Sequence, residues 1–484
     1  MMKRQILFGV LAGLLLASSC GTAGETESTD TAAEQTAETT AAAPRANLPE
    51  GLDFGGNGFH CAAYQPGVGD FYYYADSENG DVMNDALYHR TRAVEEELNV
   101  KITFDWYKGG GSYKDEMIDL VKDQVLAGDS GIDQVLTHSI NGIAVMSSGG
   151  YLTDIDELPY ISTSADWWNA EQMNNLRLGK KTYFAVNDFM LPSPYLIYFN
   201  RDMIADFDLD DPYQLVYDGK WTLDAFARLA EAVKADLNGD GKMKYQDDRW
   251  GVSCWEASKY ISFMPGADVF ITGRGADGQM TVDMDIGKAQ RVCEVLSQLT
   301  TQEINYYGVQ TDTATHLLLD SGRVLFYLDS IANITKLRDC TVEFGLLPYP
   351  KYDEDQKDYR SLDWGGLMCV PIGAQEEITA AVMELEAFKS KDEVISTYYD
   401  VLLGQKLARD EDARTMLELV SDTLCYEIGG TYFGQTAGFN KLFYTACSLA
   451  VEKKSADFAS WYASQKTAAE ATIADYYQAL DSQE

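Results

Sequence analysis

The feature that most constrains the fold is a regular alternation of strand-like and helix-like segments. Apolar or alternating runs typical of strands are separated by runs whose apolar residues recur every three or four positions, as on one face of a helix. The segments, strand-like and helix-like in turn, are residues 60–64, 86–98, 100–106, 113–127 and 132–137. Such an order builds a twisted, mostly parallel sheet with helices on both faces. The sequence therefore predicts an α/β fold.

The N-terminus has the pattern of an export signal. Lys3 and Arg4 precede an apolar stretch of about eleven residues, which is too short to span a bilayer. Small residues and then Cys20 follow, which resembles the lipobox of bacterial lipoproteins, where the cysteine is lipidated and becomes the mature N-terminus. An ordinary signal peptide with a chance cysteine is the alternative. We expect a signal peptide over residues 1–19 and an exported protein, lipid-anchored through Cys20 to the outer face of the bacterial cell membrane.

The next segment, residues 20–50, consists mainly of Thr, Ala, Glu, Ser and Gly. It has too few apolar residues to form a core, so it is predicted to be a disordered linker. No later segment approaches 18 consecutive apolar residues, so the sequence predicts a soluble folded body beyond the linker.

The charge and the cysteines exclude several classes of function. The chain has 38 Lys and Arg against 76 Asp and Glu, a formal net charge of −38. So acidic a surface repels nucleic acid and anionic lipid and favours a neutral or cationic ligand. Apart from Cys20, the cysteines are scattered and form neither a disulfide framework nor a zinc motif. They are Cys61, Cys254, Cys293, Cys340, Cys369, Cys425 and Cys447.

One acidic loop has the spacing of a calcium site. Hard oxygen ligands would come from alternate positions of residues 236–247, with Gly241 at the turn. The predicted ligands are Asp236, Asn238, Asp240, the carbonyl of Lys242, and Asp247. The strand-like residues 250–252 that follow differ from the second helix of an EF-hand, so a structural Ca²⁺ is expected rather than a sensor. A solvated turn without metal is the alternative.

No catalytic motif stands out. The four histidines are isolated, and neither a nucleophile elbow nor a phosphate-binding loop is present in the sequence. Two of the many carboxylates could form a glycosidase pair, but sequence alone cannot place them together. Aromatic residues are numerous, with 30 Tyr, 19 Phe and 8 Trp. Their flat rings can stack on the C–H faces of sugars, which offers a physical route to carbohydrate binding.

A series of short motifs, in order, then resembles a known family. The motifs are residues 198–202 (YFNRD), 220–224 (KWTLD), the acidic loop with 250–252 (WGV), 322–326 (GRVLF) and 344–352 (FGLLPYPKY). Together with the lipobox and linker they resemble the family 1 extracellular solute-binding proteins of carbohydrate ABC transporters, the group that includes maltose-binding protein. The resemblance extends from about residue 56 to the end of the chain.

This resemblance implies a periplasmic-binding-protein-like fold of two discontinuous α/β lobes joined by a three-crossing hinge. The crossings are expected near residues 188–195, 324–329 and 363–368. The expected N-terminal lobe comprises residues 51–190 and 324–364, and the expected C-terminal lobe comprises residues 191–323 and 365–484. Hinge motion would close the lobes over a ligand between them.

The resemblance also implies which residues bind the ligand, because strand ends and hinge loops carry the binding groups in this family. By position they are Tyr64, Gln65, Thr137, His138, Asp188, Trp255, Glu256, Tyr327, Asp329, Trp364 and Tyr432. Some have a structural alternative: Asp188 as a turn residue, His138 as a buried histidine and Trp255 as part of the core.

The function implied is that of a non-enzymatic, monomeric receptor. It would capture a neutral sugar or oligosaccharide and deliver it to the permease subunits of an ABC importer. Contact with the membrane would be through the lipid anchor only, and nucleic acid would not be a partner. A secreted glycoside hydrolase and a calcium-stabilised adhesion module are the alternatives, and a polyol or peptide ligand stays open.

Overall fold

The computed structural model describes most of the chain from residue 46 onward. The described residues are 46–65, 73–108, 114–128, 131–138, 143–308, 318–337, 339–363, 365–407, 410–434, 436, 438–452 and 457–482. The expected signal peptide, Cys20 and most of the expected linker lie outside this range. Residues 46–50, expected to be disordered, instead contact the folded body: the Asn47 backbone N–H donates to Glu384 Oε1 at 3.2 Å, and its side-chain amide donates to the Tyr160 carbonyl at 2.9 Å. These contacts could not be expected from the composition of the linker, because the acceptors belong to residues far away in the sequence.

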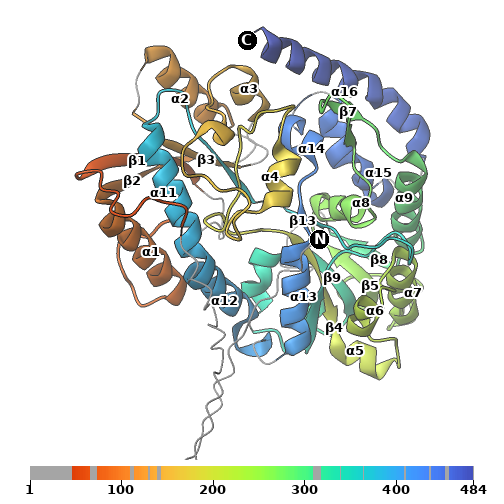
Figure 1. Ribbon diagram of the computed structural model, residues 1–484. Helices are drawn as coiled ribbons and strands as arrows, with labels where there is room; N and C mark the ends of the chain where they lie inside the picture. The colour runs from red at the N-terminus through yellow and green to blue at the C-terminus, as the bar shows by residue number, and fades with distance from the viewer. Residues whose placement is uncertain are drawn as a thin grey trace, which may run out of the picture. The chain divides into compact units, whose positions relative to one another are not determined.

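The first sheet has the strand order β12-β3-β1-β2. Its strands are β1 (Asn57–Gln65), β2 (Val100–Lys108), β3 (Gln134–His138) and β12 (Gly366–Cys369). β1, β2 and β3 are parallel, as the sequence predicts, and β12 runs antiparallel to β3. Helix α1 (Val82–Leu98) links β1 to β2, and α2 (Lys114–Ala127) links β2 to β3. Helix α11 (Glu376–Lys389) packs against α1 (Figure 1).

The second sheet has the strand order β10-β4-β9-β5-β8. Its strands are β4 (Tyr195–Asn200), β5 (Trp250–Cys254), β8 (Asn305–Tyr307), β9 (Val324–Ser330) and β10 (Phe344–Leu347). β9, β5 and β8 are parallel, while β4 is antiparallel to both β9 and β10. Helix α7 (Leu223–Val233) packs on β5, and its N-cap is Thr222, whose hydroxyl accepts from Ala225 N at 3.3 Å. Helix α9 (Ile286–Thr301) packs against α7.

The remaining elements of the described chain are as follows. The helices are α3 (Ile143–Ser148), α4 (Ala170–Leu176), α5 (Arg201–Asp206), α6 (Pro212–Tyr217), α8 (Phe263–Gly266), α12 (Ile395–Leu407), α13 (Glu411–Asp422), α14 (Ile428–Phe433), α15 (Ala446–Glu452) and α16 (Phe458–Asp481). The short strands are β6 (Thr272–Arg274), β7 (Met280–Val282), β11 (Ser361–Leu362) and β13 (Leu424–Cys425). Tight 3-10 turns are η1 (Ile155–Glu157), η2 (Ala257–Ser262) and η3 (Ile331–Leu337), and the π-helical segments are η4 (Ser390–Val394) and η5 (Lys441–Thr445).

The strand pairing corrects the expected lobe boundaries. Residues 324–364 are expected in the N-terminal lobe, yet β9 and β10 belong to the second sheet. Conversely, β12 lies within the expected C-terminal segment 365–484 but pairs with β3 of the first sheet. Residues 324–329 form part of an inner strand of the second sheet, and a crossing at this place stays a prediction. The sequence does not show which sheet β9 joins, because β9 is buried throughout and such an apolar run fits an inner position in either sheet.

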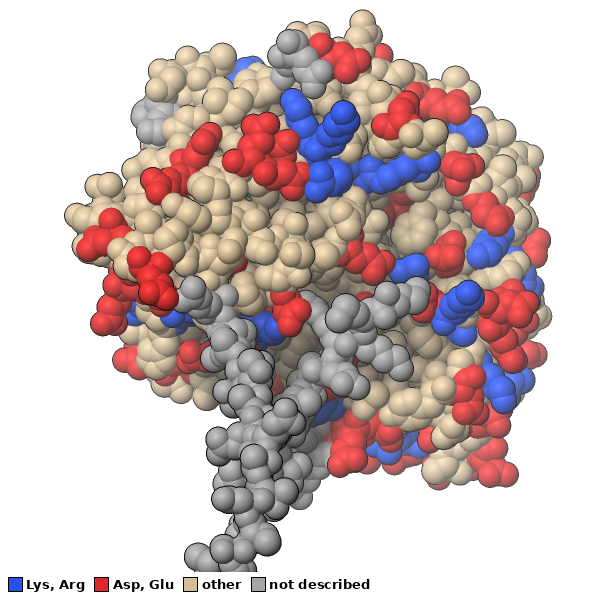
Figure 2. All heavy atoms as spheres, viewed as in Figure 1, with Lys and Arg blue, Asp and Glu red and all other residues tan. Residues whose placement is uncertain are grey.

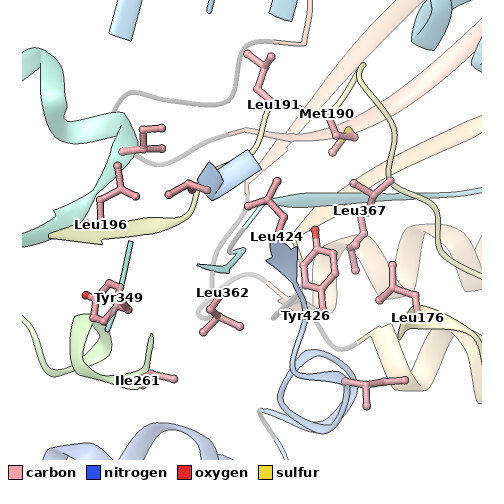
Figure 3. Packing of buried hydrophobic residues seen from close by; sticks show 14 of the residues in the cluster. Leu176, Met190, Leu191, Leu196, Ile261, Tyr349, Leu362, Leu367, Leu424 and Tyr426 are labelled. Atoms are coloured by element: carbon pink, nitrogen blue, oxygen red, sulfur yellow. The ribbon is translucent and has the colours of Figure 1, made fainter. Parts of the chain in front are cut away.

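Buried side chains from elements of both sheets form one core. Figure 3 labels Leu367 of β12, Leu196 of β4 and Tyr426, which follows β13, and all three belong to the same buried cluster. All seven cysteines among the described residues are buried and free. On the face of the molecule that Figure 2 shows, acidic side chains are spread over the surface with Lys and Arg between them. No helix in the described part of the chain is both long enough and apolar enough to span a bilayer.

Candidate functional site

A group of aromatic and ionisable side chains lies at the carboxyl edge of the first sheet. β1 and β3 are parallel, so Tyr64 and His138 end their strands on the same side, with ring centroids 5.7 Å apart. Tyr73 packs on Tyr64 at 6.2 Å. We call Tyr64, Tyr73, His138 and Asp363 the first-sheet cluster. Burial lowers the pKa of His138 to about 4, so its imidazole is neutral at pH 7 and can act as donor and acceptor at once.

Asp363 lies near Tyr64, and its carboxylate accepts hydrogen bonds from four groups outside the cluster. Its Oδ1 accepts from the backbone N–H groups of Ser193 at 3.0 Å and Gly365 at 2.8 Å. Its Oδ2 accepts from Gln172 Nε2 at 3.0 Å and from the Tyr426 hydroxyl at 3.5 Å. Burial raises the pKa of the carboxyl, and these donors partly offset that effect. The carboxylate therefore joins segments that lie far apart in the sequence.

A second group occupies the carboxyl edge of the second sheet. We call Tyr195, Trp255, Glu256, Lys259 and Asp329 the second-sheet cluster. Lys259 Nζ lies 2.9 Å from Glu256 Oε2 and 4.0 Å from Asp329 Oδ1. It also stands over the rings of Tyr195 and Trp255, 4.6 and 4.5 Å from their centroids. Burial opposes its charge, but Tyr195, Glu256 and Asp329 raise the pKa of Lys259, which stays an ammonium.

The half-buried Trp255 retains an unused donor. Its indole Nε1 is buried and has no hydrogen-bond acceptor among the described residues. A buried donor without an acceptor costs free energy, so a ligand oxygen reaching this atom would bind favourably.

The segment around Ser193 joins the two clusters. The Ser193 backbone donates to Asp363, while its hydroxyl lies 3.3 Å from the hydroxyl of Ser330, at the end of β9. Pro194 forms an isolated antiparallel β-bridge with Asp363. The Pro194 carbonyl accepts a hydrogen bond from Ile331 N at 2.9 Å. The carboxyl edges of both sheets therefore meet along one segment. In open α/β sheets, ligands bind outside the carboxyl ends of the strands.

Most of the predicted ligand residues lie in or beside these clusters. Thr137 is buried at the end of β3, and the Tyr327 hydroxyl donates to Asp329 Oδ2 at 2.5 Å. Asp188 is half-buried, and its backbone N–H donates to the Trp167 carbonyl at 2.9 Å.

Tyr432 is placed differently, as is clear from its contacts. It is buried in α14, its hydroxyl donates to the Leu176 carbonyl at 2.8 Å, and its ring meets Phe184 edge-on. These contacts describe a core residue. Trp364 and the side chain of Gln65 lie outside the described residues.

Sequence reasoning missed four members of the clusters: Tyr73, Tyr195, Lys259 and Asp363. Lys259 had one local signal, because it follows Glu256 by three residues on the η2 turn. Asp363 lies in an expected hinge crossing, but its bonds to Gln172 and Ser193 come from distant segments.

The acidic loop 236–247 uses its carboxylates internally. Asp236 accepts from the backbone N–H groups of Gly239 and Gly241, both at 2.7 Å. Asp240 accepts from Lys242 N at 2.9 Å and pairs with Lys244 Nζ at 2.5 Å. Across the described chain, no group of three or more His, Cys, Asp or Glu is arranged to hold a metal. Lys244 competes with a cation for Asp240, and calcium binding by this loop stays a prediction.

Chelation tests that prediction directly. If the loop holds structural Ca²⁺, removing the ion with EDTA should lower the melting temperature, because an ion bound to the native state stabilises it by mass action. Asp240→Ala should abolish the sensitivity by removing a ligand. Differential scanning calorimetry with and without chelator measures both. A wild-type melting temperature that ignores EDTA contradicts the metal site.

Comparison with known proteins identifies the family of this chain. The family model of bacterial extracellular solute-binding proteins matches residues 96–402. No curated protein sequence matches the chain.

Similar solved structures show the same fold. One is the galacto-N-biose/lacto-N-biose I-binding protein of an ABC transporter from Bifidobacterium longum, in complex with lacto-N-biose, at 13% identity, TM-score 0.58, and coverage of 88% of this chain and 98% of that chain. Another is a cyclo/maltodextrin-binding protein with maltotetraose, at 12% identity, TM-score 0.53, and coverage of 92% and 98%. The GacH receptor of Streptomyces glaucescens matches at 13% identity, TM-score 0.51, and coverage of 88% and 99%. The likeness confirms the predicted periplasmic-binding-protein-like, two-lobed α/β fold.

Proposed function

The chain belongs to the bacterial extracellular solute-binding proteins, and on this premise we propose that it captures a neutral sugar or oligosaccharide for an ABC importer. Membership of an extracellular family makes it an exported protein. The ligand would lie between the first-sheet and second-sheet clusters, with the lobes closing over it. The permease would recognise the closed form, and the protein itself would act as a monomer without catalysis.

The observation that carries this proposal is the meeting of two polar and aromatic clusters at the Ser193 segment. Rings such as Tyr64 and Trp255 can stack on sugar C–H faces. Carboxylates and the neutral His138 can hydrogen-bond to hydroxyls. Structures of the same fold hold lacto-N-biose and maltotetraose, which agrees with this chemistry. The family and fold favour a transport receptor over a glycoside hydrolase or an adhesion module.

The membrane tether is a further part of the proposal. Cys20 and the polar residues after it would form a lipid anchor and a linker, with the ordered body starting near Ala46. The anchor would keep the receptor beside its permease on the outer face of the cell membrane.

Replacing Trp255 with alanine tests the site. If its indole stacks on or donates to the sugar, Trp255→Ala should weaken binding by about 1–3 kcal/mol, with little change in melting temperature because the residue is only half-buried. A thermal-shift screen of mono- and oligosaccharides identifies the ligand, and calorimetric titration then measures the affinity.

Trp461→Ala provides a matched control. Trp461 is also half-buried but lies on α16, where it packs on Phe458 with ring centroids 5.6 Å apart. Its loss should leave the affinity unchanged. Equal affinities of wild type and Trp255→Ala for the identified sugar would remove Trp255 from the binding site.

A further inference from the structure

Two buried cysteines lie where helix α15 packs against helix α9 (Figure 1). Cys293 is in the middle of α9, and Cys447 is the second residue of α15. The Sγ atom of Cys293 lies 3.8 Å from the carbonyl oxygen of Ala446, the residue directly before Cys447. The side chain of Cys293 therefore points at the backbone that carries Cys447.

The separation of the two residues suits a disulfide bond, whose Cα atoms are about 4.4–6.8 Å apart. In a trans peptide the carbonyl oxygen lies about 2.8 Å from the next Cα, so the Cα of Cys447 is within about 6.6 Å of Cys293 Sγ. Burial raises the pKa of the Cys447 thiol, and the nearby thiol of Cys293 raises it further. Because each sulfur follows a single side-chain torsion, rotation about the two Cα–Cβ bonds can bring the sulfurs together.

A second pair of thiols shows that electrostatic interaction alone does not make a disulfide. Cys369 also raises the pKa of Cys61. However, Cys61 is on β1 and Cys369 is on β12, and β3 lies between these two strands. Two strand spacings amount to about 9.6 Å, which is too far for a disulfide bond. At the contact of α9 and α15, the two helices pack on each other directly.

We propose that Cys293 and Cys447 form a disulfide bond in the exported protein. Exported proteins meet oxidising conditions, in which disulfides form and persist. The oxidant is the disulfide of a thiol oxidoreductase or of a small thiol compound. One cysteine thiolate attacks that disulfide, which forms a mixed disulfide and releases one thiol. The second cysteine attacks the Cys sulfur of the mixed disulfide, which forms the Sγ–Sγ bond and releases the other thiol. The two cysteines lose two electrons and two protons, and the oxidant gains both.

This exchange takes place before α15 packs on α9. In the folded protein both sulfurs are buried, and burial raises the pKa of both thiols, so little thiolate is present to react. The bond closes a long loop of the chain and thereby restricts the unfolded state. It also holds α15, which packs on the η2 turn that carries Lys259 of the second-sheet cluster.

Peptide mapping of the exported wild-type protein tests the proposal. The protein is collected with N-ethylmaleimide present, which blocks free thiols, and is digested with trypsin without reduction. Cys293 and Cys447 fall in separate tryptic peptides, residues 292–323 and 442–453, each with one cysteine. Mass spectrometry should find these two peptides linked, and dithiothreitol should separate them. Recovery of both peptides carrying N-ethylmaleimide, or linked to other cysteine peptides, would refute the disulfide.

Melting temperatures before and after reduction give a second measurement. The oxidised wild type should melt about 5 °C above the reduced protein, because the bond restricts the unfolded chain. Cys447→Ala should remove this difference, and Cys61→Ala, at another buried cysteine, should retain it. A difference that persists in Cys447→Ala contradicts the proposal. If Cys447→Ala does not fold, the peptide map of the wild type decides.

Discussion

Glu384→Ala is expected to lower the free energy of unfolding by about 3–5 kcal/mol, because it removes one buried acceptor that serves several donors. Oε1 accepts from Trp167 Nε1 at 3.0 Å, and Oε2 accepts from Trp168 Nε1 at 2.7 Å. The backbone N–H groups of Asn47 and Ser162 also donate to this carboxylate, at 3.2 and 3.4 Å. Alanine leaves the buried indole N–H groups of Trp167 and Trp168 without partners and opens a cavity.

Urea unfolding followed by circular dichroism measures the loss. Glu377→Ala is a matched control on the same helix, because Glu377 is exposed and accepts one hydrogen bond, from the Tyr160 hydroxyl at 2.8 Å. That substitution should cost less than about 1 kcal/mol. If the two variants are equally stable, Glu384 does not hold the N-terminal segment and the tryptophans as described.

Local patterns predicted much of the fold. The helical spacing of α1 and α2 and the apolar runs of β1, β2 and β3 depend on neighbours in the sequence, and the structure places these elements as expected. Capping of α7 by Thr222 is likewise local, since capping acts within one helical turn.

Contacts between distant segments account for the failures. The sequence of β9 does not indicate which strands pair with it. Its place between β4 and β5 depends on segments far away in the sequence. Lys259 reads as a surface residue until Tyr195, 64 residues earlier, comes to lie under its ammonium group. The resemblance places Asp363 in an expected hinge crossing, but its bonds to Gln172 and Tyr426 join distant segments and have no signal in the sequence.

Asp363→Ala is expected to destabilise the protein by about 2–4 kcal/mol and to weaken sugar binding as well. The variant leaves the buried N–H groups of Ser193 and Gly365 without an acceptor, together with Gln172 Nε2 and the Tyr426 hydroxyl. Removing a carboxylate that burial disfavours offsets part of the loss. Affinity should fall because the Ser193 segment, which joins the two clusters, is no longer fixed.

Urea unfolding and calorimetric titration with the identified sugar measure the two effects. Asp353→Ala is the control, because Asp353 is exposed and accepts only from the N–H groups of Asp355 and Gln356 in its own turn, among the contacts described. It should change neither quantity appreciably. A stable Asp363→Ala variant with wild-type affinity would contradict the central role of this carboxylate.

The pH dependence of stability distinguishes the effect of the Asp363 charge from the effect of the size of its side chain. Burial raises the pKa of this carboxyl above its ordinary value of 3.8, so the folded state binds its proton more tightly than the unfolded state does. The Asp363 contribution to stability is therefore greatest below pH 3.8 and declines as the pH rises through the raised pKa. Asp363→Asn keeps the size of the side chain but cannot titrate. Its stability relative to wild type should therefore increase over that same rise in pH, and a constant difference would show that the carboxyl titrates alike in both states.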